Sequence, residues 1–196
     1  EFKLGRFEIV GTDRGIGILE LASKLRSGMK LPEGVPTTLD VSHVHEAAPS
    51  AYPNGTHVAE VEIDPDTGHV EVVKYTMVGD FGTVINPLLV EGQSHGGVVQ
   101  GISQAIFEHV VYSEEGQPLT GSFTDYAIPR AGDAPSFKID YHSVPAKTNV
   151  LGAKGCGEAG CAGSLPSVMN AISDALGGKH INMPATPERV WAALNG

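Results

Sequence analysis

The sequence predicts an α+β fold in which helices pack on a mixed β-sheet. Alternating apolar and polar residues at 58–63 are followed by a turn and a second strand-like segment at 70–78, which together are typical of a β-hairpin. Apolar and small residues recur at helical spacing over 90–110 and again over 164–176. Because a further strand-like segment separates these two helical segments, we expect a sheet with helices packed on it.

The segment before the hairpin predicts a helix and an extended connection. Residues 15–26 have apolar side chains at helical spacing and are followed by a glycine. Residues 29–55 are rich in Pro, Gly, Ser and Asn, which favours an extended chain. We therefore divide the sequence into a segment at 1–55, made of this helix and connection, and a domain at 56–196.

The hairpin has one face toward the core and one toward water. Ala59, Val61 and Ile63 share one face, and Glu60 and Glu62 share the other. An Asp-Pro-Asp-Thr-Gly sequence between the strands is a typical turn. We expect this hairpin to be structural.

The helix expected at 90–110 is rich in glycine. Each glycine costs a helix about 1 kcal/mol relative to alanine, so its presence indicates a close approach to another part of the protein. For Gly101 we expect tight packing against the sheet. At the helix start, Gln93, Ser94 and free N–H groups are placed to meet an anionic ligand such as phosphate.

Two strands are expected in the segment that follows. Residues 119–129 predict a strand, and the alternative is that the polar residues 121–126 turn along a cofactor or subunit face. Asp125 and Arg130 are expected to form a structural ion pair. Residues 137–144 are a second strand candidate.

Two C-terminal helices have recognisable ends. In the first, Ser164 is the expected N-cap, Pro166 occupies an early helical position, and a glycine pair at 177–178 stops the helix. The last helix is expected to begin at Thr186 and Pro187 and to direct three apolar side chains into the core, namely Val190, Trp191 and Leu194.

The segment Gly152-Ala-Lys-Gly-Cys-Gly-Glu158-Ala-Gly-Cys-Ala162 places a single carboxylate in a glycine-rich loop. Glycine lets a backbone approach a ligand closely and offer its N–H groups, so Glu158 is a candidate site residue. Residues 155–160 also match the G-x-G-x-x-G pattern of dinucleotide-binding turns. That pattern needs a strand directly before it and a helix directly after it, and neither is predicted here, so nucleotide binding is a weak alternative. A glycine-rich connection whose Glu158 faces water is a stronger one.

Composition excludes several functional classes. The net charge is −10 with only 13 Lys and Arg residues, which disfavours both nucleic acid and anionic membranes as partners. No apolar run is long enough to span a bilayer, and no N-terminal signal segment is recognised. The sequence does not start with Met, so we expect it to be processed or to be part of something longer. A cytoplasmic location is the expectation.

The cysteines and histidines do not predict a metal site. Cys156 and Cys161 are the only cysteines, and their spacing does not match a C-x-x-C pair or a zinc site. We expect two free, reduced thiols. His43 and His45 can share a strand face, but no third ligand is near in sequence.

From residue 80 to residue 176 the sequence resembles the C-terminal part of the molybdenum-binding large subunit of the molybdenum hydroxylases. This family includes xanthine dehydrogenase, aldehyde oxidase and aerobic carbon monoxide dehydrogenase. The first fifty residues carry the resemblance more loosely. The matching segments occur in the family's order and are Gly79-Asp-Phe-Gly-Thr-Val-Ile-Asn-Pro87, Glu91-Gly-Gln-Ser-His-Gly-Gly-Val-Val-Gln-Gly-Ile102, Leu119-Thr-Gly-Ser-Phe-Thr-Asp-Tyr-Ala-Ile-Pro-Arg130, Gly152-Ala-Lys-Gly-Cys-Gly-Glu-Ala-Gly160 and Pro166-Ser-Val-Met-Asn-Ala-Ile-Ser-Asp-Ala-Leu176.

The resemblance implies a domain of the molybdenum cofactor-binding type and a molybdenum–molybdopterin cofactor in its cytosine dinucleotide form. It implies that Glu158 is the general base in the oxidative hydroxylation of a C–H carbon, with water as the oxygen source. Burial in a dry glycine pocket suits a carboxylate to that role, which is typically worth about 10² to 10⁴ in rate. The implied cofactor contacts are Gln93 and the backbone of Lys154, Gly155, Cys156 and Gly157.

The same resemblance implies partners and leaves the substrate open. FAD and 2Fe–2S clusters are expected on partner domains or subunits, and the remainder of the large subunit is expected to complete the pocket. The substrate is a small molecule, either an aldehyde, a purine, an N-heterocycle or carbon monoxide. Because family large subunits are much longer, the alternative is a catalytically inert fragment, or an accessory subunit that completes a cofactor site only with a partner chain.

Overall fold

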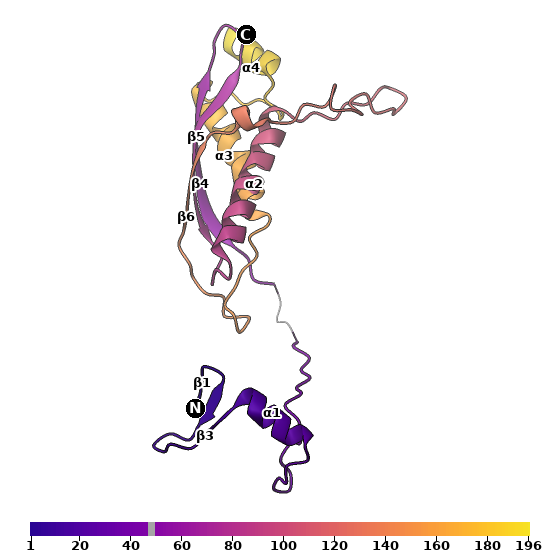
Figure 1. Cartoon of the computed structure of the whole chain (residues 1–196). Helices are drawn as coiled ribbons and strands as arrows, with labels where there is room; N and C mark the ends of the chain where they lie inside the picture. The colour runs from indigo at the N-terminus through magenta and orange to yellow at the C-terminus, as the bar shows by residue number, and fades with distance from the viewer. Residues whose placement is uncertain (47–49) are drawn as a thin grey trace. The chain divides into compact units, whose positions relative to one another are not determined.

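The computed structural model describes residues 1–46 and 50–196 and divides the chain into two compact units, Glu1–Glu46 and Ala47–Gly196 (Figure 1). In the first unit, β1 (Phe2–Lys3), β2 (Arg6–Glu8) and β3 (Gly15–Gly17) form an antiparallel sheet in that order. Helix α1 (Ile18–Arg26) follows directly and buries none of its residues.

The expected N-terminal helix is confirmed, but its first three predicted residues form β3 instead. Strands β1 and β2 were not predicted, because strands of two or three residues are too short to show a periodic pattern. The extended connection is confirmed over 29–46 and 50–53, which hold no helix or strand, but its last two predicted residues, 54–55, begin the next strand. Its residues 47–49 lie outside the described part of the chain.

The second unit is built on a three-stranded mixed sheet. Strands β4 (Asn54–Ile63) and β5 (Val70–Asp80) form the predicted antiparallel hairpin, with an irregular register at Glu60 and Val61. Strand β6 (Ser136–Tyr141) pairs in parallel with β5, so the strand order is β4-β5-β6. The predicted strand at 137–144 is therefore present, although it ends three residues early.

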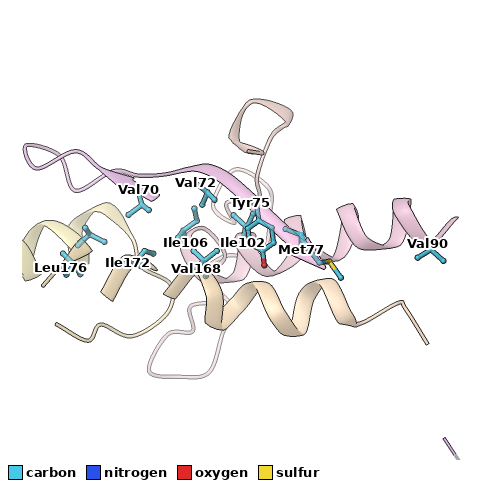
Figure 2. Packing of buried hydrophobic residues seen from close by; sticks show 14 of the residues in the cluster. Val70, Val72, Tyr75, Met77, Val90, Ile102, Ile106, Val168, Ile172 and Leu176 are labelled. Atoms are coloured by element: carbon cyan, nitrogen blue, oxygen red, sulfur yellow. The ribbon is translucent and has the colours of Figure 1, made fainter. Parts of the chain in front are cut away.

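Helices α2 (Pro87–Ile106) and α3 (Ala159–Ala175) cover one face of this sheet (Figure 1). Their apolar side chains meet those of β5 in a single core. Figure 2 shows this core, in which Tyr75 and Met77 of β5 pack with residues of both helices. The α+β prediction is thus confirmed, and its physical basis is the apolar face of the hairpin, which the two helices remove from water.

Both helices begin earlier than the sequence predicts. The α2 N-cap is Asn86, whose side-chain oxygen accepts from Leu89 N–H at 3.3 Å, and Pro87 occupies the first helical position. Helix α3 begins at Ala159, so Ser164 is no N-cap and Pro166 lies inside the helix. The predicted glycine stop is confirmed, because both residues after Leu176 are glycines with positive φ.

The segment at 119–129 forms no strand, and residues 123–125 form a turn, as in the alternative given for its polar part. Figure 1 shows this region running out from the helices and the sheet. The predicted ion pair between Asp125 and Arg130 is also absent from the described residues. Asp125 accepts from Ser122 Oγ at 2.9 Å, and Arg130 N–H donates to Asp133 at 2.7 Å. These local side-chain hydrogen bonds compete with strand pairing, which explains the difference.

Helix α4 (Pro187–Asn195) begins where predicted, with Thr186 as its N-cap residue. Val190 is fully buried as expected, but Trp191 is 47% exposed and is not a core residue. No helix among the described residues has the length and apolar content needed to cross a membrane.

Candidate active site

Close contact between α2 and α3 fixes the position of the glycine-rich segment. A Cβ atom at Gly160 would lie 2.8 Å from both Ser94 O and Val98 N, which are backbone atoms of α2. One turn later, a Cβ at Gly101 would lie 1.7 Å from Ser164 Oγ. Only glycine permits helix backbones to approach this closely. The first turn of α3 therefore lies beside residues 94–98 of α2, and the glycines pack helix against helix rather than helix against sheet.

Glu158 is the N-cap residue of α3, with φ −103° and ψ −13°, and its side chain makes no capping hydrogen bond. The carboxylate is exposed, whereas the sequence predicted a dry pocket around it. Within the described residues, the backbone N–H groups of Gly155, Cys156, Gly157 and Glu158 donate to no partner. Unpaired N–H groups at a helix start favour ligands rich in hydrogen-bond acceptors, especially anionic ones.

The two glycines just before Glu158 leave this backbone accessible. A Cβ at Gly155 would meet nothing within 4 Å, and a Cβ at Gly157 would meet only Gln93 Oε1, at 3.8 Å. Cys156, between them, packs its side chain against the core and leaves its backbone on the loop. An acceptor-rich group such as a pterin or a phosphate therefore fits against this segment without a steric barrier.

Gln93 approaches the glycine-rich loop with its side chain and does not offer a free backbone N–H group. Because α2 begins at Pro87, Gln93 and Ser94 lie in its second turn, so the predicted free N–H groups at these two positions are wrong. Ser94 is buried and its hydroxyl donates to Val90 O at 2.8 Å, which removes it from the site. Gln93 is exposed beside Gly157 and remains a candidate contact.

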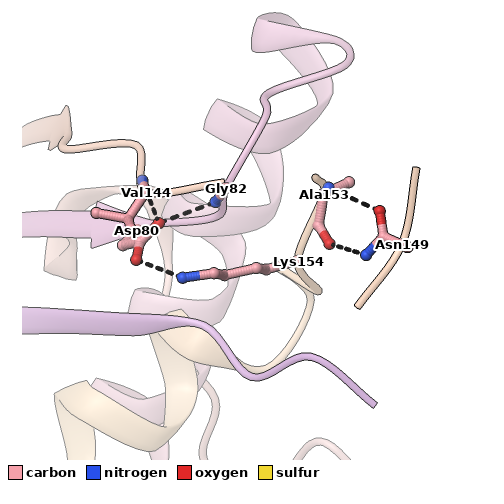
Figure 3. A network of polar contacts seen from close by, with 6 residues as sticks. All are labelled: Asp80, Gly82, Val144, Asn149, Ala153 and Lys154. Carbon is pink, nitrogen blue, oxygen red and sulfur yellow. Dashed lines mark hydrogen bonds and ion pairs between the residues drawn. The ribbon is translucent and has the colours of Figure 1, made fainter. Parts of the chain in front are cut away.

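Lys154 is occupied within the chain. Its ammonium group donates to Asp80 Oδ2 at 2.6 Å, and its backbone N–H donates to Phe81 O at 2.9 Å. Asp80 Oδ1 also accepts from Gly82 N–H and Val144 N–H, each at 2.9 Å (Figure 3). The side chain of Lys154 thus faces Asp80, and neither of its donor groups is free for a ligand.

These hydrogen bonds hold the pKa of Asp80 well below its usual range, the one from Lys154 having the largest effect. A carboxylate with a lowered pKa stabilises the fold at pH values above its unfolded pKa, here 3.8, and loses that contribution as the pH falls through the folded value. We expect Asp80→Asn to lower the melting temperature relative to wild type. The difference should have its full size at about pH 7 and become progressively smaller below about pH 4. Melting curves of both proteins across this pH range measure the difference in melting temperature. An equal difference at every pH would contradict the prediction.

Tyr141 was not singled out by the sequence. Its hydroxyl is buried without a hydrogen-bond partner in the described residues, and its ring packs on Phe81 with centroids 5.7 Å apart. Burial has the largest effect and raises the pKa of this phenol, the nearby Ser94 hydroxyl lowers it, and Glu91 and Cys156 raise it. An unpaired buried hydroxyl beside Cys156 is a further polar group at this site.

The described part of the chain holds no group of three His, Cys, Asp or Glu side chains arranged to bind a metal ion. Both cysteines are free thiols, and burial, followed by Glu108 and Glu158, raises the pKa of Cys161. The glycine pattern at 155–160 does open onto a helix, contrary to the sequence prediction. No strand leads into it, however, because β6 ends at Tyr141. The dinucleotide-binding arrangement is therefore incomplete.

Comparisons with known proteins identify the family of this chain. Residues 1–135 match the molybdopterin cofactor-binding domain family. The chain is 40% identical over 170 residues to the nicotine 6-hydroxylase large subunit of Paenarthrobacter nicotinovorans, covering 85% of this chain and 21% of that protein. It is 34% identical to the carbon monoxide dehydrogenase large chain of Afipia carboxidovorans, covering 82% of this chain and 20% of that one.

Two solved structures resemble the whole fold. Carbon monoxide dehydrogenase from Oligotropha carboxidovorans superposes with a TM-score of 0.88 at 30% identity, covering 98% of this chain and 24% of that one. Quinoline 2-oxidoreductase from Pseudomonas putida 86 gives a TM-score of 0.85 at 34% identity, covering 92% and 24%. The chain spans about a fifth to a quarter of the length of these relatives. It belongs to the molybdopterin cofactor-binding domain family of the molybdenum hydroxylases.

Proposed function

We propose that this chain forms one wall of a molybdopterin site. The backbone N–H groups of Gly155, Cys156 and Gly157 donate to acceptor atoms of the cofactor, and the Gln93 side-chain amide provides a further contact. The observation that carries the proposal is the run of unpaired N–H groups, on open glycine backbone, beside Gln93. The Lys154 side chain supports this wall and does not contact the cofactor, because its ammonium group binds Asp80.

Glu158 is the general base of the reaction. When bound, the molybdenum cofactor supplies the oxidising power that removes electrons from the substrate carbon. The carboxylate of Glu158 accepts the proton that water must lose to provide the product oxygen. Glu158 is the N-cap residue of α3 and directly follows Gly155–Gly157, so the base lies next to the N–H groups proposed to hold the cofactor.

The reaction class is oxidative hydroxylation of a C–H carbon in an aldehyde, purine or N-heterocycle, or oxidation of carbon monoxide, with water as the oxygen source. The 40% identity to a nicotine 6-hydroxylase subunit and the likeness to quinoline 2-oxidoreductase favour an N-heterocycle. The cofactor is in its cytosine dinucleotide form, and FAD and 2Fe–2S centres lie on partner domains or subunits in the cytoplasm.

The exposure of Glu158 means that this chain alone does not enclose a reaction. The remainder of the large subunit supplies the opposite wall and excludes water from the site. The alternative of a catalytically inert fragment therefore applies to the isolated chain and not to the assembled enzyme.

The cofactor contact is tested with Gln93→Ala in the assembled enzyme. Loss of one hydrogen bond to the cofactor is expected to weaken molybdenum retention by about tenfold after dialysis. Gln100→Ala is the matched control, because Gln100 is an exposed glutamine on the same helix. Metal analysis of both variants decides the matter: equal molybdenum-to-protein ratios would remove Gln93 from the site.

A further inference from the structure

Asp80 joins three segments that lie far apart in the sequence. Its Oδ1 atom accepts from the backbone of Gly82, in the turn after β5, and from Val144, which follows β6. Its Oδ2 atom accepts from the ammonium group of Lys154, immediately before the cofactor loop. The side chains of Lys154 and Asp80 are only 10% and 12% exposed, so this ion pair is largely shielded from water.

Backbone pairing reinforces the same junction. Thr83 N–H donates to Gly152 O, and Lys154 N–H donates to Phe81 O, both at 2.9 Å, so the chain after β5 and the chain before Gly155 run side by side. The Asn149 side chain makes two hydrogen bonds to the backbone of Ala153, at 2.9 and 3.1 Å (Figure 3). The segment is therefore fixed by hydrogen bonds up to Lys154, whereas the backbone N–H groups that follow, from Gly155, have no partner in the described residues.

We propose that Asp80 and Lys154 are positioning residues: their ion pair sets the place at which Gly155–Gly157 and Glu158 meet the cofactor and the substrate. The proposal rests on the function proposed above for these four residues. It assigns a role to Asp80 and changes that of Lys154 from a cofactor contact to a support. Because a displacement of about 1 Å at reacting groups can cost about 100-fold in rate, a support of this kind affects catalysis without touching the reactants.

A double-mutant cycle separates support from direct contact. Asp80→Asn and Lys154→Met each remove the ion pair, and the first keeps an oxygen for the Gly82 and Val144 N–H groups. In the assembled enzyme, we expect each single variant to lose about 10- to 100-fold in kcat with a much smaller change in KM. The double variant should be no worse than either single variant, since all three lack the same interaction.

Hydrogen exchange of the peptide covering 145–157 provides a readout that does not depend on turnover. We expect exchange of the Lys154 amide to become about tenfold faster in both single variants. Lys154→Arg should restore slow exchange and most of kcat, because arginine can still pair with Asp80. Lys74→Met is the matched control: it removes an ion pair of similar length, 2.7 Å to Glu60, from an exposed place on the same strand, and it should change neither quantity.

The possible outcomes distinguish failure of the positioning role from failure of the proposed function. If Lys154→Met loses molybdenum and Asp80→Asn does not, or if their effects on kcat multiply in the double variant, Lys154 contacts the cofactor directly and the proposal is wrong. Unchanged exchange in Asp80→Asn would also overturn it. If the loop loosens as expected while Glu158→Gln and Gln93→Ala have no effect, the support is real and the proposed function fails instead.

Discussion

Glu158→Gln is expected to lower the turnover of the assembled enzyme by about 10² to 10⁴, which corresponds to about 3 to 5 kcal/mol of activation free energy. Glutamine matches glutamate in size and keeps one acceptor oxygen, but it does not take up the proton. Glu158 makes no capping hydrogen bond and is exposed, so its replacement removes no interaction that supports the fold of this chain. Molybdenum content and melting temperature should therefore stay at wild-type values.

Rapid mixing of enzyme with substrate, without an electron acceptor, measures this step directly. Glu188→Gln is the matched control, because Glu188 is also an exposed glutamate at the start of a helix, in the first turn of α4. The control enzyme should be reduced by the substrate at the wild-type rate. A Glu158→Gln enzyme that is reduced equally fast would show that Glu158 is a structural loop residue.

Gly82→Ala is expected to destabilise the fold by about 2 to 5 kcal/mol and to disturb the segment that precedes Gly155. Gly82 has φ +61°, where a side chain costs about 1 to 2 kcal/mol. A Cβ there would also lie 2.1 Å from the carbonyl oxygen of Gly152, and overpacking of this kind costs about 1 to 3 kcal/mol. The expected drop in melting temperature is at least about 4 °C.

Gly116→Ala measures the first of these effects alone, so the difference between the two variants isolates the second. Gly116 also has a positive φ, +82°, but a Cβ there would meet nothing within 4 Å. Thermal unfolding of the two variants should therefore show the larger loss at Gly82, and exchange of the Lys154 amide should accelerate only there. Equal losses at both positions would mean that the chain after β5 yields easily and does not hold the loop.

The sequence alone determined the elements whose pattern is local. The hairpin of β4 and β5 was predicted because alternating residues and a strong turn occur within one short segment. The C-terminal end of α3 and the start of α4 were predicted because glycine and proline act through backbone geometry alone. The resemblance to molybdenum hydroxylases was also available from sequence, because it rests on linear segments, and the family comparison confirms it.

Only the tertiary structure decided how the candidate site is arranged. Ser164 and Pro166 have the local pattern of a helix start, yet α3 begins at Ala159, because Gly160 packs on the backbone of α2 and this contact outweighs local preference. The same contact brings Gln93 beside Gly157. Asp80 and Lys154 are 74 positions apart, and no pattern in the sequence connects them. Their pairing depends on parallel strands and a crossover helix, and such non-local contacts are set by the whole fold.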